Sequence, residues 1–210
     1  QIYVEQMIPS RMGYPLWTPS PSASLPLTYQ MKGISVGDIG IITTPHGGFD
    51  YIFNIWLDSA NFNGQIPPKI TEKYPYFCNQ FHAISRGSII GNINKTTGKT
   101  SFTCKRDIPG AILFLPDGAS HENFQDDLTD YISQHAESWF LHVKTAKQRN
   151  INQKSLYLIT GCTKTKTWGI VSYHENDSAD KVTLKFKKVS CSDGPQYTWQ
   201  ENGAIAGLST

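Results

Sequence analysis

Alternating apolar and polar positions predict several β-strands in the first half of the chain. Residues 49–55 alternate Phe, Tyr, Phe and Ile with Asp, Ile and Asn, which is the period of a strand with one core face. Residues 37–42, Gly-Asp-Ile-Gly-Ile-Ile, lie just before them, across a turn at 45–48. The two segments therefore predict a hairpin-like pair of strands.

The second half of the chain predicts a β-α-β unit. A short apolar strand at 111–115 is followed by a Pro-Asp-Gly-Ala-Ser turn and then by a helix from about His121 to Lys147. Acidic residues come first in this helix and basic residues last, which complements the helix dipole. Residues 155–160 form another apolar run, so 110–160 predict two parallel strands joined by the helix. Residues 167–173 and 182–189 predict a further hairpin.

The first thirty residues contain five prolines and several serines, which favours an extended and poorly helical segment. Tyr14, Leu16 and Trp17 lie within it, and exposing such side chains would forfeit about 1.5 to 3 kcal/mol each. We therefore expect a single globular domain, 1–210, with a Pro-rich N-terminal arm, 1–30, packed on it. The expected fold class is α+β, with a mixed β-sheet, one long helix and the β-α-β unit.

Composition supports a folded core and narrows the classes of partner. Of 210 residues, 39% are hydrophobic and 17% charged, enough apolar surface to offset chain entropy. The net charge is only +2, so nucleic acid is not an expected partner and any basic site must be local. No apolar run approaches the roughly 20 residues that span a bilayer, so no membrane span is expected.

Cysteine usage favours a reducing compartment. Cys78, Cys104, Cys162 and Cys191 are far apart and form no Cys-x-x-Cys pair, so reduced thiols and a cytoplasmic location are expected, without cofactor or metal. Secretion stays open as an alternative, because the triplets beginning at Asn94 and Asn176 match the glycosylation acceptor pattern. The spacing alone leaves all three disulfide connectivities formally possible.

Two motifs resemble catalytic or metal sites but lack their context. Residues 33–37, Gly-Ile-Ser-Val-Gly, match a nucleophile elbow, yet a strand rather than a helix follows Ser35, which favours a tight glycine turn. His121, His135 and His142 recur at multiples of seven along the expected helix. Seven residues separate helical positions by roughly 10 Å, too far for one ion, so packing positions are the simpler interpretation.

The expected β-α-β unit brings two strand-end loops together. Open α/β sheets bind ligands at the carboxyl ends of their strands, and a helix start offers free amides to an anion. Cys162 would be the only cysteine placed to act as a nucleophile there, and helix capping beside a solvated loop is the alternative. The candidate ligand-binding residues are Asp117, Gly118, Ser120, Thr160, Gly161, Cys162, Lys164 and Lys166.

Lysines and tryptophans supply two further candidate surfaces. In residues 182–187 the apolar Val182, Leu184 and Phe186 alternate with Thr183, Lys185 and Lys187, so one strand face is basic. It either meets phosphates or an acidic partner, or protects an edge strand from aggregation. Sugar-stacking platforms could come from Trp17, Trp56, Trp168 and Trp199, although no repeat places them symmetrically.

Several segments spread along most of the chain share one pattern. They are Gly-Tyr-Pro-Leu-Trp at 13–17, residues 32–40, residues 47–55, His-Ala-Glu-Ser-Trp at 135–139, Leu-Tyr-Leu-Ile-Thr-Gly-Cys at 156–162, and Trp168-Gly169. Together they resemble a domain of unknown function from basidiomycete fungi, often found near the start of larger, NTPase-containing receptor-like proteins. An acidic residue follows the Gly-Cys pair in that pattern, whereas Thr163 stands here. The resemblance implies an intracellular fungal module of defence or self-recognition, and it carries over no catalytic residue.

Three hypotheses follow. The first is a non-catalytic recognition module that binds a small ligand, a glycan or a protein. The second is a carbohydrate-binding, lectin-like defence protein. The third is a small-molecule enzyme that uses the strand-end loops 117–120 and 160–166.

Overall fold

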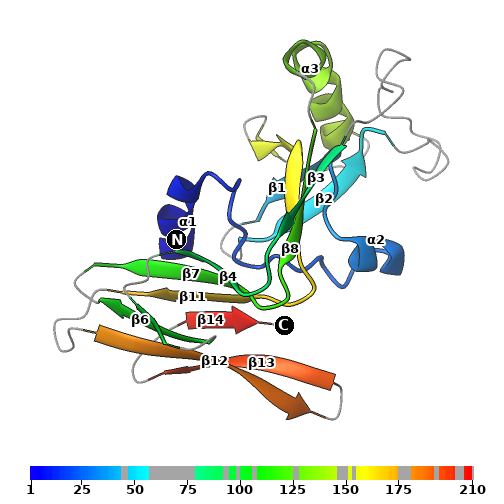
Figure 1. Cartoon of the computed structure of the whole chain (residues 1–210). Coiled ribbons are helices and arrows are strands. Elements are labelled where there is room, and N and C mark those ends of the chain that lie inside the picture. The colour runs from blue at the N-terminus through cyan, green and yellow to red at the C-terminus, as the bar shows by residue number, and fades with distance from the viewer. Residues whose placement is uncertain are drawn as a thin grey trace. The chain divides into compact units, whose positions relative to one another are not determined.

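The computed structural model of the chain is a mixed α+β protein built mostly of strands (Figure 1). It describes residues 1–43, 47–56, 79–91, 95–97, 100–105, 108–124, 128–145, 151–152, 155–174, 181–191, 194–201 and 206–209. The chain divides into two compact units. Unit 1 comprises Gln1–Trp17, Ala83–Ser120 and Thr163–Thr210, and unit 2 comprises Thr18–His82 and His121–Cys162. The expectation of a single domain stays a prediction.

The helical elements are α1 (Ile2–Met7), the 3₁₀ turn η1 (Ile8–Ser10), α2 (Leu27–Lys32) and α3 (Thr129–Thr145). The first strands are β1 (Asp38–Ile42), β2 (Phe49–Asn54), β3 (Asn79–Ile84), β4 (Ser88–Gly91), β5 (Lys95–Thr97), β6 (Ser101–Lys105) and β7 (Gly110–Leu115). The remaining strands are β8 (Ala119–Phe124), β9 (Tyr157–Leu158), β10 (Gly161–Lys164), β11 (Gly169–Tyr173), β12 (Lys181–Cys191), β13 (Gly194–Glu201) and β14 (Ala206–Ser209). Among the sheets, one of three strands has the order β10-β8-β3.

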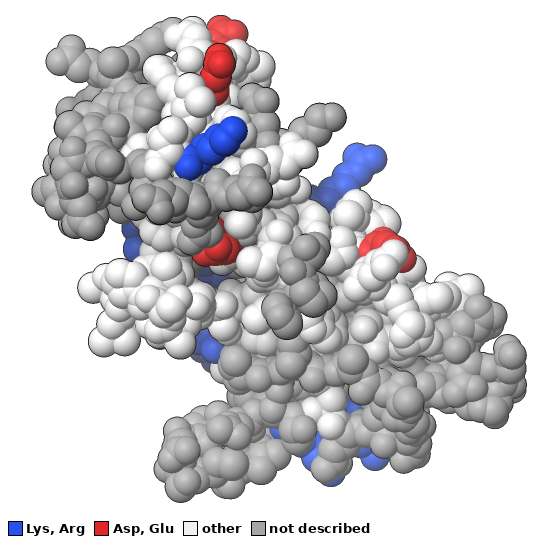
Figure 2. Space-filling model, turned by 180° about the vertical axis from the view of Figure 1, so that it is seen from behind, with Lys and Arg blue, Asp and Glu red and all other residues white. Residues whose placement is uncertain are grey.

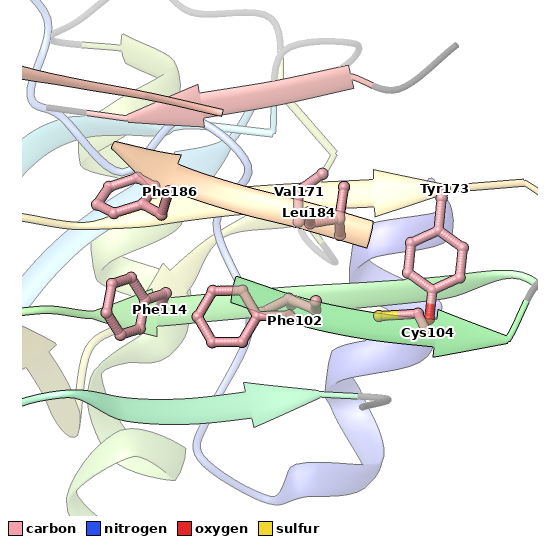
Figure 3. Close-up of a cluster of buried hydrophobic side chains, with 8 residues drawn as sticks. Phe102, Cys104, Phe114, Val171, Tyr173, Leu184 and Phe186 are labelled. Atoms are coloured by element: carbon pink, nitrogen blue, oxygen red, sulfur yellow. The ribbon is translucent and has the colours of Figure 1, made fainter. Parts of the chain in front are cut away.

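Unit 1 is a sandwich of two four-stranded sheets, with the orders β14-β11-β7-β4 and β13-β12-β6-β5. Their facing side chains form one buried cluster, shown in Figure 3, to which both sheets contribute aromatic rings. Phe114 of one sheet meets Phe186 of the other edge to face, with ring centroids 5.2 Å apart. The cluster consists of Phe102, Cys104, Ile112, Phe114, Val171, Tyr173, Leu184 and Phe186.

Helix α1 covers the other face of the β7 sheet. Tyr3 and Met7 are buried against Ala111, Leu115 and Ile170, the residues that alternate with those of the sandwich core. Strand β7 is apolar at every position after Gly110 because both of its faces are covered.

The N-terminal segment therefore corrects the expectation of a poorly helical arm. Helix α1 ends before Pro9, so no proline interrupts its hydrogen bonds, and Pro9 lies in the first turn of η1, where it is tolerated. Of the expected apolar anchors, Trp17 packs edge-on against Tyr3 at 5.5 Å between centroids. Tyr14, in contrast, is 49% exposed.

Unit 2 contains a three-stranded sheet of order β2-β1-β9 and the helix α3. The expected hairpin is confirmed, because β1 and β2 pair antiparallel from Ile42 opposite Phe49 to Asp38 opposite Asn54. On α3 the buried residues Tyr131, Trp139 and Val143 form one stripe, since they lie eight and four positions apart. This stripe packs against β1 and β2 in a cluster that includes Ile39 and Phe53.

The expected helix from about His121 to Lys147 is wrong at its start, because residues 121–124 belong to β8 and α3 begins at Thr129. The chain leaves β7 through Gly118, whose φ of +79° suits a turn, and continues as a strand. Asn123 disfavours a helix interior, since short polar side chains compete for backbone hydrogen bonds.

The expected β-α-β unit is not confirmed. Strand β7 pairs antiparallel with β4 and β11, whereas β9 pairs antiparallel with β1 in another sheet. The expected hairpin of residues 167–173 and 182–189 is also wrong. Strands β11 and β12 belong to different sheets and meet face to face through the sandwich core. The free energy gained by burying the apolar faces of both strands exceeds the advantage that a short connection gives to pairing them edge to edge.

None of the helices in the described part of the chain is long and apolar enough to cross a membrane.

Candidate functional site

Among the residues of unit 2 that the structure describes, Asp38 is a buried carboxylate. It begins β1 and is only 2% exposed, and the neighbouring polar residues Ser35 and Asn54 are buried with it. Burying an ionisable group costs several kcal/mol unless hydrogen bonds compensate for the lost water. The surrounding donors therefore decide what Asp38 can do.

Both carboxylate oxygens of Asp38 accept hydrogen bonds from nearby donors. Oδ2 accepts from the Tyr29 hydroxyl at 2.8 Å and from the Ser35 backbone N–H at 2.7 Å. Oδ1 accepts from Asn54 Nδ2 at 2.8 Å. The three donors come from α2, from the turn before β1 and from β2, so one side chain joins three segments of the chain.

Asn54 is fixed by its own partners, which orients its amide towards Asp38. Its Nδ2 also donates to the Val36 carbonyl at 3.1 Å, and its Oδ1 accepts from the Trp56 backbone N–H at 2.9 Å. Turning the amide over would lose all of these bonds, because donor would then face donor and acceptor would face acceptor. Asn54 therefore always presents a donor to Asp38.

Burial changes the protonation of this centre. Desolvation raises the pKa of Asp38, while the bonds from Asn54, the Ser35 backbone and Tyr29, and the nearby charge of Lys32, pull it in the opposite direction. Burial, followed by the charge of Asp38, raises the pKa of the Tyr29 hydroxyl far above its ordinary value. The same two causes raise the pKa of Tyr51 to about 12. Tyr29 consequently remains a hydrogen-bond donor throughout the physiological range.

The expected tight turn at residues 33–37 is confirmed, and it belongs to this centre. Gly33 and Gly37 have φ of +70° and +87°, values that residues with a Cβ atom rarely adopt. The Asp38 N–H closes the turn by donating to the Ser35 carbonyl at 3.0 Å, and the Ser35 hydroxyl donates to the Gly33 carbonyl at 3.3 Å. Ser35 is buried, and a strand follows it rather than the helix of a nucleophile elbow.

Helix α2 is held by its inner face and exposes its outer face. Tyr29 faces inwards, where its hydroxyl reaches Asp38 and its ring lies 4.2 Å from the ring of Tyr51, centroid to centroid. Gln30 Nε2 ties the helix to the preceding loop by donating to the Leu25 carbonyl at 2.6 Å. On the outside, Leu27 is 69% and Met31 82% exposed. These two side chains are four residues apart and so share one face.

The expected strand-end site is divided between the two units. In unit 1 the loop of Asp117 and Gly118 meets the loop before β11: Thr167 Oγ1 donates to Asp117 Oδ2 at 2.6 Å, and Thr165 Oγ1 donates to the Gly118 carbonyl at 2.7 Å. Ser120 and Lys166 are exposed and Lys164 is half-buried in the same unit. The helix that was expected to follow this loop from about His121 begins further on, at Thr129.

The other three predicted residues belong to unit 2. The Thr160 carbonyl accepts a hydrogen bond from the Phe124 N–H at 2.8 Å, and Gly161 is exposed in β10. Cys162 is half-buried, and its Sγ lies 3.5 Å from the Ile34 carbonyl, to which it donates. Cys162 is therefore beside the turn of the Asp38 centre, and whether it acts as a nucleophile stays a prediction.

The histidine pattern does not form a ladder on one helix. His121 lies in β8, whereas His135 and His142 lie on α3. His135 packs between Tyr131 and Trp139. The centroid of its ring lies 4.4 Å from that of Tyr131 and 6.1 Å from that of Trp139. Over the described ranges, no group of three or more His, Cys, Asp and Glu side chains is arranged to hold a metal ion.

Sequence reasoning missed Tyr29, Asp38 and Asn54 as a group. One signal was available, since Asp38 is a charged residue directly before an apolar strand segment. Its partners are nine and sixteen residues away, at separations that no helical or strand period links.

No known protein family, no curated protein and no solved structure matches the chain.

Proposed function

We propose that this protein is a non-catalytic recognition module, of the fungal defence or self-recognition kind that the sequence resemblance implies. In this proposal the outer face of α2 inserts into an apolar groove of a protein partner. The observation that carries it is the pair of exposed side chains Leu27 and Met31 on a helix whose other face is anchored to Asp38.

The exposed pair suits helix-in-groove recognition. Leu and Met at positions i and i+4 supply two adjacent apolar anchors, the pattern by which short helices bind grooves. Met adapts to irregular apolar surfaces because its side chain is unbranched and polarisable. A helix of six residues would not persist alone in water, so tertiary contacts must hold this one in place.

The Asp38 centre supports the proposal by preorganising α2. Its three donors fix the turn, β2 and Tyr29 before any partner arrives. Fixing a binding element beforehand lowers the entropy cost of association. The same saturation argues against Asp38 as a catalytic base, since its lone pairs already serve buried donors.

A site-specific photocrosslinker tests this surface. A photoreactive amino acid replaces Met31 in one variant and Leu141, which is 50% exposed on α3, in a matched control. In fungal extract, the Met31 variant should give a discrete protein adduct that the control does not give. Adding Leu27→Ser to the Met31 variant should abolish it. Identical adduct patterns at both positions would exclude α2 as the docking element.

A further inference from the structure

One face of the β13-β12-β6-β5 sheet in unit 1 combines lysine with small polar residues. Leu184 and Phe186 of β12 point into the sandwich core, whereas Thr183, Lys185 and Lys187 between and beside them are exposed. We call the exposed side the lysine face. The expected alternation of this strand is confirmed over residues 183–187, and Val182 lies outside the side chains that the structure describes.

The register extends the lysine face over the neighbouring strand β6. Lys185 is opposite Ser101 of β6, and Thr183 is opposite Thr103 of the same strand. Directly opposed residues of an antiparallel pair belong to the same face. Among the side chains that the structure describes, this face is therefore built from Lys, Ser and Thr: Ser101, Thr103, Thr183, Lys185 and Lys187.

Protection of an edge strand does not explain Lys185. Strand β12 pairs with β6 over residues 181–185 and with β13 over residues 184–191, so Leu184 and Lys185 have a neighbouring strand on both sides. Lysine protects a sheet against aggregation where backbone groups of an edge are unpaired, and Lys185 does not lie at such an edge. A basic face at an inner position of the sheet is complementary to a ligand of opposite charge.

We propose that the lysine face docks on the surface of an anionic lipid bilayer. Lysine is a compact point charge, suited to a diffuse layer of headgroups, and the charges are spread over a broad sheet face. The positions just described include no arginine for bidentate phosphate contacts and no aromatic residue for base stacking, the features that nucleic-acid surfaces use. Trp199 of β13 packs instead against the core side. Figure 2 shows the blue of Lys and Arg along the lower rim, where Figure 1 draws β12 and β13.

This docking is peripheral and electrostatic. Thr183, Lys185 and Lys187 are the exposed residues described on β12, and none of them is a large apolar side chain that would insert among acyl chains. Each lysine near an anionic surface strengthens binding by about fivefold, and this gain falls with ionic strength. The inference is independent of the α2 surface, because it rests on the other unit.

Vesicle cosedimentation with the full chain tests the proposal. The protein is mixed with phosphatidylcholine vesicles with or without phosphatidylserine, at low and physiological salt. Binding should require phosphatidylserine and weaken with salt, and Lys185→Gln/Lys187→Gln should reduce it about 25-fold. The matched control is Lys144→Gln/Lys166→Gln, which removes the same charge from exposed positions elsewhere. It should retain nearly wild-type binding.

Three outcomes would overturn the proposal. They are failure of the wild-type chain to bind phosphatidylserine vesicles, equal weakening by the two double variants, and equal binding to neutral vesicles. A duplex DNA arm at the same salt addresses the other polyanion: tighter binding to DNA, with the same dependence on Lys185 and Lys187, would assign the face to nucleic acid instead. Circular dichroism of both double variants verifies that they fold.

Discussion

Replacing Tyr29 by Phe tests whether the Asp38 centre holds α2. The change removes one hydroxyl, 2.8 Å from a buried carboxylate oxygen, and leaves the ring that lies 4.2 Å from Tyr51. A hydrogen bond to a charged group contributes about 1.5 to 3 kcal/mol. Asp38 keeps its bonds to the Ser35 N–H and Asn54, so we expect a loss of about 2 kcal/mol, which is ~30-fold in an equilibrium constant.

Native-state hydrogen exchange measures this loss locally. Amide protons of peptides that cover α2, β1 and β2 should exchange about 30-fold faster in Tyr29→Phe, because local opening becomes more favourable. The control is Tyr157→Phe in the same unit, where the side chain is 43% exposed. Changes at such surface positions usually stay within about 0.5 kcal/mol.

The reasoning fails if exchange in Tyr29→Phe matches the wild type. That result would mean that water or another donor replaces the hydroxyl without cost, and that the ring alone positions α2. It would also weaken the proposed preorganisation of the Leu27 and Met31 face.

Three further predictions concern protonation, a turn and a thiol. Because burial raises the folded-state pKa of Asp38 above its unfolded value of about 3.9, stability relative to Asp38→Asn should rise as pH falls through the folded pKa; urea unfolding that shows the opposite trend contradicts this. Gly118→Ala should cost more in thermal unfolding than Gly87→Ala: both have positive φ, but a Cβ at Gly118 meets the Ile84 carbonyl and one at Gly87 meets nothing within 4 Å. Burial raises the pKa of the Cys104 thiol, so a thiol reagent should label it only as fast as the protein unfolds, and labelling at the rate of a small free thiol would refute its burial.

The elements that could be predicted were those whose burial is visible locally. Strand β7 is apolar at successive positions, and residues 183–187 alternate, so both were predictable from period alone. The pairing of strands was not. Strands β11 and β12 are neighbours in sequence, yet their apolar faces meet across the sandwich rather than edge to edge. Only the complete set of strands decides between these arrangements.

The candidate site was still less predictable. Asp117 and Gly118 were correctly placed in a loop, but the helix expected to begin beside them starts at Thr129. The acidic residues after His121 would complement the helix dipole at any of several starting positions. They therefore do not fix the residue at which the helix begins. Asp38 is recognisable as a charge beside an apolar run. Tyr29 and Asn54 meet at Asp38 because the turn and the hairpin act together. No single hydrophobic period in the sequence predicts both.

The position of α1 has a consequence for synthesis of the chain. Tyr3 and Met7 are made before the residues that bury them, which are Ala111 and Leu115 of β7 and Trp168 and Ile170. At ~5–20 residues per second, the ~160 residues from Met7 to Trp168 take about 8 to 30 s to be made. A six-residue helix is not stable alone for that time. This segment therefore stays uncovered and apolar until the residues that bury it have been made, which makes it a natural substrate for chaperones during translation.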